Sequence, residues 1–257
     1  MPRLFFICIF VSALTSFAST NKQPSVSDPQ ALNYAAQSIA AMGSLVVNNV
    51  TLTGSVTWMA GSDTENGTAT FLASSTGESR MDLALSSGTR TEIRDASTGS
   101  PRGKWIAPNG ASGKFAFHNC QTDAVWFFPV LSSLAAGPDI VLSYVGRENH
   151  DGQDVQHIRA YRSFQGAPDI FQRLATMDFY LYATTLLPSA ITFNNHPDND
   201  MSRNITMEVT FSNYQPMSGM NIPLHVQQFV EGTLVLDITI SNAAFNTGIA
   251  LSNFAIN

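Results

Sequence analysis

Apolar and polar residues alternate with a period of two along most of this 257-residue chain. Between 205 and 211 and between 233 and 240, every second residue is Ile, Leu, Val, Met or Phe. The same period begins at Val46 and returns at 80–85. Because successive side chains of a strand point to opposite faces, the sequence predicts about eleven antiparallel strands with one apolar face. The expected fold class is α+β, mainly β, built on one long, strongly curved antiparallel sheet.

Residues 28–42 break this period and are predicted to form a helix. Asp28 stands before Pro29 as a cap residue ahead of a first-turn proline, and Gly43 marks the end. Apolar residues between them recur at helical spacing, on one stripe. This helix must pack that stripe against another element.

A second helix is predicted over 122–134, within the most apolar run that follows the N-terminal segment. Thr122-Asp123 provides a start signal, and Pro129 predicts a kink near Phe128. A lone apolar helix in a β-rich chain has two interpretations. It is either a plug that completes the core or a lid over an apolar pocket.

Residues 1–18 have the pattern of a cleaved signal peptide. Arg3 is followed by an apolar run from Leu4 to Leu14 and by the small-x-small site Ser16-Phe17-Ala18. The run is too short to span a bilayer comfortably, and no second hydrophobic stretch follows it. Cys8 lacks the preceding small residues of a lipid-modified cysteine. We therefore expect residues 19–257 to form a single soluble domain that is periplasmic or secreted, with no transmembrane segment after cleavage.

Charge and cysteine content exclude two classes of protein. The formal net charge is −6, which argues against a nucleic-acid partner, because such partners require basic patches. Only Cys120 remains after signal cleavage, so an intramolecular disulfide is impossible. Stability must therefore come from the core.

The sequence predicts no catalytic residue, no metal site and no cofactor. His118 and Cys120 would need mutual hydrogen-bond reach and an orienting carboxylate, which is not evident. The loop 196–200 has three metal-type ligands, but a calcium loop needs more ligands and a turn glycine. There is no G-x-S-x-G elbow and no phosphate-binding glycine loop. The protein is not expected to be an enzyme.

Large apolar side chains are the candidate ligand-binding residues. They could line a pocket or form ordinary core, because aromatic residues carry much of any core's burial. Three adjacent aromatics cannot all point the same way from a helix, so at least one of 126–128 must face something other than the sheet. The candidates for the pocket and its lid are Trp58, Trp105, Trp126, Phe127, Phe128 and Leu131.

The second half of the chain carries short motifs in a characteristic order. They include Met177-Asp178-Phe179-Tyr180-Leu181, Thr185-Leu186-Leu187-Pro188 and Val209-Thr210-Phe211-Ser212-Asn213-Tyr214. On this basis the chain resembles the periplasmic carriers of outer-membrane lipoproteins, the LolA-like family. The resemblance covers roughly 140–241 well, and the first half only by its helix-then-meander layout.

That resemblance implies a fold and a function. Family members fold as an incomplete barrel, whose helices cover a concave apolar face that receives acyl chains. No ligand-contacting residue of the family matches a position here, so none is assigned. The implied function is a non-enzymatic carrier with an apolar pocket for a lipid or acylated ligand, and under it the 122–134 segment is a lid. The alternative is a structural or protein-interaction module of the cell envelope with no small-molecule ligand. A hydrolase is the third hypothesis, and it lacks a nucleophile paired with a base.

Overall fold

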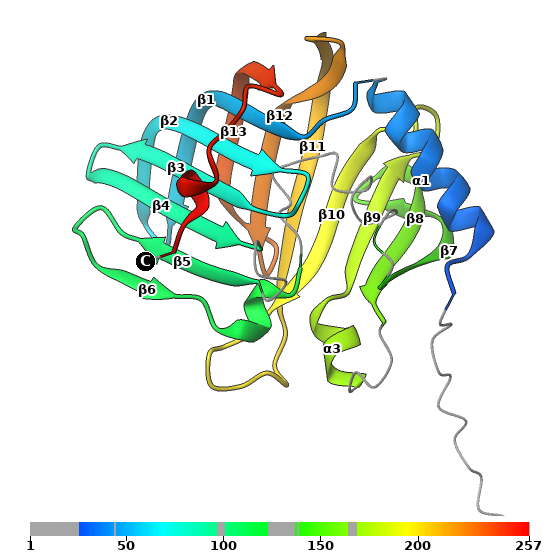
Figure 1. The fold of residues 1–257 in the computed structure, drawn as a ribbon, viewed down its shortest axis with the longest axis horizontal. Helices are drawn as coiled ribbons and strands as arrows, with labels where there is room; N and C mark the ends of the chain where they lie inside the picture. Colours follow the sequence, from blue (N-terminus) through cyan, green and yellow to red (C-terminus); the bar gives the residue numbers. More distant parts are fainter. Residues whose placement is uncertain are drawn as a thin grey trace, which may run out of the picture.

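The computed structural model describes residues 26–43, 45–96, 101–122, 137, 139–163 and 169–256. Within these ranges the chain forms one sheet with a few short helices around it (Figure 1). The helices are α1 (Pro29–Met42), α3 (Asp169–Leu174) and the 3-10 helices η1 (Phe117–Cys120) and η2 (Leu251–Phe254). The strands are β1 (Asn49–Ala60), β2 (Asp63–Ser74), β3 (Ser79–Leu85), β4 (Gly88–Asp95), β5 (Arg102–Ile106), β6 (Ser112–Lys114), β7 (Ile140–His150), β8 (Gln153–Arg162), β9 (Met177–Tyr182), β10 (Pro188–Asn195), β11 (Ile205–Met217), β12 (Met220–Val230) and β13 (Thr233–Phe245).

All the described strands belong to one antiparallel sheet. Its order is β6-β5-β4-β3-β2-β1-β13-β12-β11-β10-β9-β8-β7, so the sheet consists of two meanders. The pairing of β1 with β13 joins them, from Val50 opposite Phe245 to Trp58 opposite Leu236, with a bulge at Thr53/Gly54. The first and last strands of the fold thus lie side by side at the centre of the sheet.

The expected fold class is confirmed as mainly β with one antiparallel sheet, but the expected shape needs a correction. β6 and β7 form the two edges and do not pair, so the sheet is open, and it bends without the strong curl that was expected. The two edges do not match in length, since β6 has 3 residues and β7 has 11. Edges of such different length cannot form a common ladder, so the sheet stays open, as the expected incomplete barrel does.

One face of the sheet is apolar across most of its width. Its buried side chains come from β1–β3 and from β7–β13, and together with residues of α1 they form a single hydrophobic cluster. Leu83, Ile158, Val209, Ile222 and Ile238 have no exposed surface. Burial of each such side chain stabilises the fold by about 1.5–3 kcal/mol. The alternation in the sequence therefore specifies which face forms the core.

Helix α1 lies across the strands, and the structure confirms the helix predicted at 28–42. The Asp28 carboxylate accepts a hydrogen bond from the Gln30 N–H at 2.7 Å, and Gly43 follows the last turn. The N–H of Asp28 donates to the Leu142 carbonyl of β7, and Gly43 forms a bridge with Met220 of β12. A 14-residue helix is about 21 Å long. This length lets α1 reach from the sheet edge at β7 to β12.

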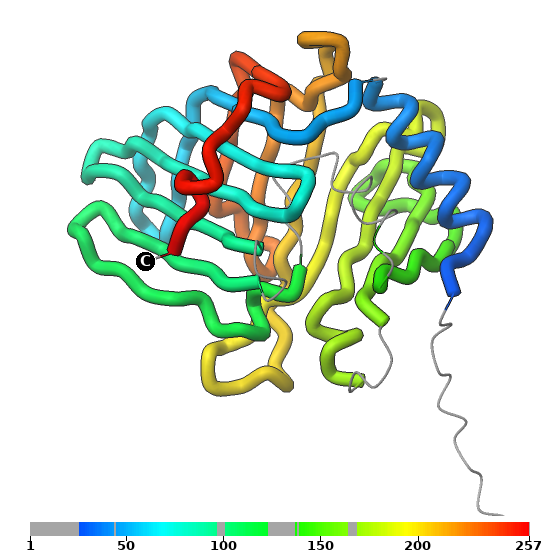
Figure 2. The backbone as a smooth tube through the Cα atoms, viewed as in Figure 1, coloured from blue at the N-terminus to red at the C-terminus, as the bar shows by residue number. Residues whose placement is uncertain are grey.

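The C-terminal segment covers part of the opposite face. It crosses the sheet near β3 and β4 (Figure 2). Arg80, which points away from the apolar face, donates to the Asn253 carbonyl at 3.4 Å. Phe254 in η2 is buried. The first meander is therefore covered behind its apolar face by the end of the chain.

Two predictions concern residues outside those that the structure describes: the signal peptide at 1–18 and the helix at 123–134. Among the described residues, no helix is long and apolar enough to cross a membrane.

Candidate functional site

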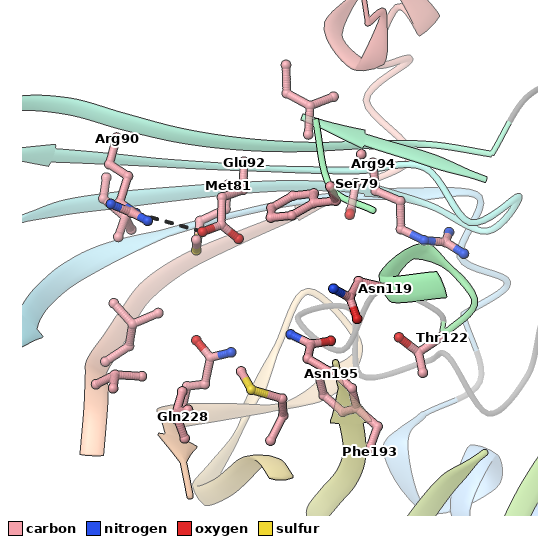
Figure 3. Close-up of a pocket in the computed structure, with 18 of the residues that line it drawn as sticks. Ser79, Met81, Arg90, Glu92, Arg94, Asn119, Thr122, Phe193, Asn195 and Gln228 are labelled. Carbon is pink, nitrogen blue, oxygen red and sulfur yellow. Dashed lines mark ion pairs between the residues drawn. The ribbon is translucent and has the colours of Figure 1, made fainter. Parts of the chain in front are cut away.

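A cavity of about 460 Å³ lies against the apolar face, between the two meanders (Figure 3). Side chains of β1, β3 and β4 line one side, and side chains of β10–β13 line the other. β4 and β10 have six strands between them, so the sheet must bend to bring their side chains to one cavity. The apolar lining includes Trp58, Met81, Phe193, Met207 and Leu236.

Strand β4 turns three charged side chains toward this cavity. Residues directly opposite in an antiparallel pair share a face, and β3 places Leu83, Met81 and Ser79 opposite Arg90, Glu92 and Arg94. Met81 and Leu83 belong to the core face. We call Arg90, Glu92 and Arg94 the charged strip of β4. It interrupts the apolar face at a strand that is not at the sheet edge.

Two of these side chains form a cluster with Trp58. The Arg90 guanidinium lies over the Trp58 ring, 5.6 Å from its centroid. Arg90 Nε and Glu92 Oε1 are 3.8 Å apart, which is an ion pair but too long for a hydrogen bond. In the part of the chain that the structure describes, the Arg90 side chain forms no hydrogen bond and interacts with the Trp58 ring and the Glu92 carboxylate. Its N–H donors point into the cavity region.

Glu92 occupies an apolar environment. Burial raises the pKa of its carboxyl, and the nearby Arg90 charge lowers it in part. The side chain nevertheless retains 33% of its accessible surface. The raised pKa and the remaining exposed surface are compatible, because that surface faces the cavity, where the surrounding protein limits solvation of the charge.

The opposite wall contributes two amide side chains. Gln228 lies on β12 in the row formed by Val209, Leu236 and Trp58. Asn195 follows Phe193 on the same face of β10. Figure 3 shows both amides across the cavity from the charged strip. No hydrogen bond is formed by either amide within the described ranges, so both can bond to a guest molecule.

Helix η1 closes one end of the cavity by binding the loop after β10. The Asn119 amide donates to the His196 carbonyl and accepts from the His196 N–H, both at 2.8 Å. His118 Nε2 lies 3.1 Å from the Pro197 carbonyl oxygen. These contacts join the first meander to the second across the cavity.

Cys120 and Arg94 lie at this end as well. Cys120 is buried, and burial raises the pKa of its thiol, while the charge of Arg94 acts in the opposite direction. Arg94 donates to the Gly77 carbonyl and to the Cys120 carbonyl. Arg94 is thus held by backbone oxygens of the protein. A thiol in this state is a poor nucleophile.

Of the six candidate ligand-binding residues, one lines the cavity, one does not, and four lie outside the described residues. Trp58 lines the cavity. Trp105 lies opposite Glu92, but its indole covers Gly113, where an added Cβ would come within 2.8 Å of the ring, and it is not among the lining residues. The remaining candidates lie outside the described residues: Trp126, Phe127, Phe128 and Leu131. Ligand contact by any of the six stays a prediction.

The groups considered for catalysis or metal binding have other partners. The His118 ring bonds to a backbone carbonyl and not to Cys120. His196 is buried and its Nδ1 lies 2.8 Å from the Arg203 carbonyl oxygen. Over the described ranges, one other group has ligand atoms close enough for a metal: His150, Asp151 and Glu208. There His150 Nε2 bonds to Glu208 at 2.7 Å, and its ring stacks on Tyr180.

Sequence reasoning missed the charged strip and Gln228. The segment 89–94 contains one apolar residue, so its alternation cannot indicate which face is inward. A signal was present at Gln228, because it occupies an apolar position in the alternation Val226, Gln228, Val230. A polar residue at a core position of a strand is unusual unless it has a partner or a function.

No protein-family model matches the sequence, and no curated protein matches it. Solved structures do match. A LolA superfamily protein from Nitrosomonas europaea superposes with a TM-score of 0.55 at 9% identity, over 88% of this chain and 97% of that one. A DUF1329 family protein from Desulfovibrio piger gives 0.54 at 10% identity, over 88% and 96%. An outer membrane lipoprotein-sorting protein domain from Vibrio parahaemolyticus gives 0.51 at 12% identity, over 88% and 96%.

The chain has the LolA fold. The match spans nearly the whole of each LolA-like chain, and it includes the first half, where the sequence resemblance was limited to the layout. At this level of identity the similarity concerns the fold alone. It assigns no functional residue, so the candidates are the residues of this chain's own cavity.

Proposed function

We propose that this protein is an exported, non-enzymatic carrier that binds a lipid or acylated ligand in the cavity between the two meanders. The observation that carries this proposal is the cavity itself. Its volume of about 460 Å³ lies within the range of about 300–1,000 Å³ that is typical of ligand sites. Its lining combines apolar side chains with a few polar groups, as such sites do.

The LolA fold supports this assignment, because one of the similar structures is described as an outer membrane lipoprotein-sorting domain. In the proposal, residues 1–18 are a signal peptide, and residues 19–257 form a single domain in the periplasm or outside the cell. Trp58, Phe193 and Leu236 contact the apolar part of the ligand.

The alternative function is an envelope module that binds a partner protein. The sheet edge at β7 supports it less well than the cavity supports a carrier. An interaction module of this kind commonly offers an open strand edge. At β7 the Leu142 carbonyl accepts from the Asp28 N–H, and the Leu142 N–H donates to Ser27. A bulge at Tyr144/Gly146 interrupts the same strand. This edge is therefore partly covered and irregular.

Native mass spectrometry of the protein purified from its host tests the proposal. We expect a population with added mass that organic extraction removes and that lipid analysis identifies as acylated. Replacement of Leu236 by Trp should fill the cavity and abolish this population, whereas replacement of the exposed Leu251 by Trp should preserve it. An unliganded wild-type protein that also takes up no added lipid would contradict the proposal.

A further inference from the structure

Arg94 of the charged strip holds two backbone carbonyls, whereas Arg90 and Glu92 have no comparable structural contact among the described residues. Arg90 and Glu92 are half-buried beside the core residues Met81 and Leu83, and partial desolvation of a charge without a good partner is costly. Arg90 and Glu92 approach only to 3.8 Å, so neither gains a hydrogen bond from the other. Replacement of such a pair by apolar residues is often neutral or stabilising. The position of both charges beside a cavity points to a role in binding.

The charges around the cavity favour a guest of one sign. Two guanidinium groups and one carboxyl line it, and no other charged side chain belongs to the lining residues that the structure describes. Arg94 is held by the Gly77 and Cys120 carbonyls, so it contributes mainly its charge. The Arg90 guanidinium lies over the Trp58 ring and forms no hydrogen bond among the described residues, so its N–H donors can bind a guest.

We propose that Arg90 binds the anionic headgroup, a carboxylate or a phosphate, of a single-chain acyl ligand. This inference rests on the proposed function, because it assigns the headgroup end of the same cavity. Arginine binds both anions through paired N–H donors. The Trp58 ring lies beside Arg90, and Leu236 is paired with Trp58 in the sheet, so these two side chains accept the first carbons of the chain. The amides of Gln228 and Asn195 are placed across the cavity to complete the hydrogen bonds of the headgroup.

Displacement of the uncharged fluorophore N-phenylnaphthylamine by four ligands with the same dodecyl-length chain tests this assignment. The ligands are laurate, dodecyl phosphate, methyl laurate and dodecylammonium. We expect the wild-type protein to bind laurate or dodecyl phosphate at least tenfold more tightly than methyl laurate, because only the anions form charge-assisted hydrogen bonds. The tighter of the two anions identifies the headgroup as a carboxylate or a phosphate.

Three variants test whether the preference for anionic ligands depends on Arg90. Arg90→Gln should weaken anion binding at least tenfold and change methyl laurate binding less than twofold. Arg147→Gln removes one positive charge from an exposed ion pair between β7 and β8, and it should leave the affinity for all four ligands unchanged. Glu92→Gln should keep or increase the anion preference, because it removes a competing carboxylate. Equal preference in Arg90→Gln and wild type, or tightest binding of dodecylammonium, would overturn the assignment.

The two proposals fail in different ways. If none of the four ligands displaces the fluorophore, the proposed function itself is wrong. If methyl laurate binds as tightly as the anions, only the headgroup assignment is wrong. Should Arg90→Gln fail to fold, the ratio of laurate to methyl laurate affinity on the wild-type protein still tests the anion preference, and a ratio near one overturns the assignment.

Discussion

The guanidinium of Arg90 lies over the indole ring of Trp58, 5.6 Å from the ring centroid. The two residues belong to β4 and β1, which β2 and β3 separate in the sheet. A cation over an aromatic face contributes about 0.5–1 kcal/mol at an exposed site, and more when it is desolvated. This contact fixes a charged group and an apolar surface next to each other on the cavity wall, which is the arrangement that an amphiphilic ligand requires.

Replacement of Trp58 by Ala should affect binding more than stability. Phe211 is fully buried, and its replacement by Ala should cost about 3–5 kcal/mol of unfolding free energy. Trp58 is half-buried and borders the cavity, so Trp58→Ala should cost no more than about 2 kcal/mol. Urea denaturation of both variants measures the difference. A loss at Trp58 as large as that at Phe211 would mean that Trp58 is ordinary core.

Replacement of Glu92 by Gln should stabilise the protein at neutral pH. Burial raises the folded-state pKa of Glu92 above its ordinary value of 4.5, so the folded state binds the proton more tightly than the unfolded state does. The contribution of Glu92 to stability is therefore present below pH 4.5 and is lost as the pH rises through the raised pKa, and the glutamine variant lacks this contribution. We expect a difference in unfolding free energy at pH 7 that disappears near pH 4. A wild-type protein that is the more stable at pH 7 would contradict this assignment.

Replacement of Asp178 by Asn should have the opposite pH dependence. Burial acts to raise the pKa of Asp178, but hydrogen bonds from His157 and Arg159 outweigh it and hold the pKa below 3.8. The carboxylate thus stabilises the fold above pH 3.8, and this contribution is lost as the pH falls through the lowered pKa. Unfolding free energies at pH 7 and pH 3 should show a cost of about 1–3 kcal/mol that shrinks in acid. The same cost at both pH values would contradict the claim that the ionised carboxylate of Asp178 stabilises the fold.

Replacement of Asn119 by Ala should loosen the end of the cavity. Its amide satisfies both backbone groups of His196, so the variant should lose about 1–3 kcal/mol of unfolding free energy. Asn119→Asp keeps the acceptor for the His196 N–H and removes the donor to its carbonyl, so it should not restore full stability. Hydrogen exchange at the His196 amide provides a local readout. Unchanged exchange in Asn119→Ala would show that η1 is held by other contacts.

Much of the fold could be predicted from the sequence, because a half-buried strand carries its own signal. β11 alternates from Ile205 to Phe211 and β13 from Leu234 to Ile240, and the residues buried within these stretches are ones that the period selects. The cap at Asp28 and the stop at Gly43 specified α1 within a residue. Register and sheet order depend on which strands meet, and nothing local specifies that β1 pairs with β13.

The candidate site was less predictable for a related reason. Trp58 could be proposed because a large aromatic residue at an inward position stands out. The inward face of β4 is set by its pairing with Met81 and Leu83, and not by its own composition, so Arg90 and Glu92 could not be placed. Aromatic character alone also selected Trp105, whose ring is occupied by packing against Gly113.

The central claim is that the cavity binds an acyl chain, and calorimetric titration of the protein with laurate at several temperatures tests it most directly. We predict saturable binding of one molecule per chain with a negative heat-capacity change, because apolar surface is buried. Leu236→Trp, which fills the cavity, should abolish the binding heat. The absence of saturable binding, or binding that Leu236→Trp leaves intact, would contradict the claim.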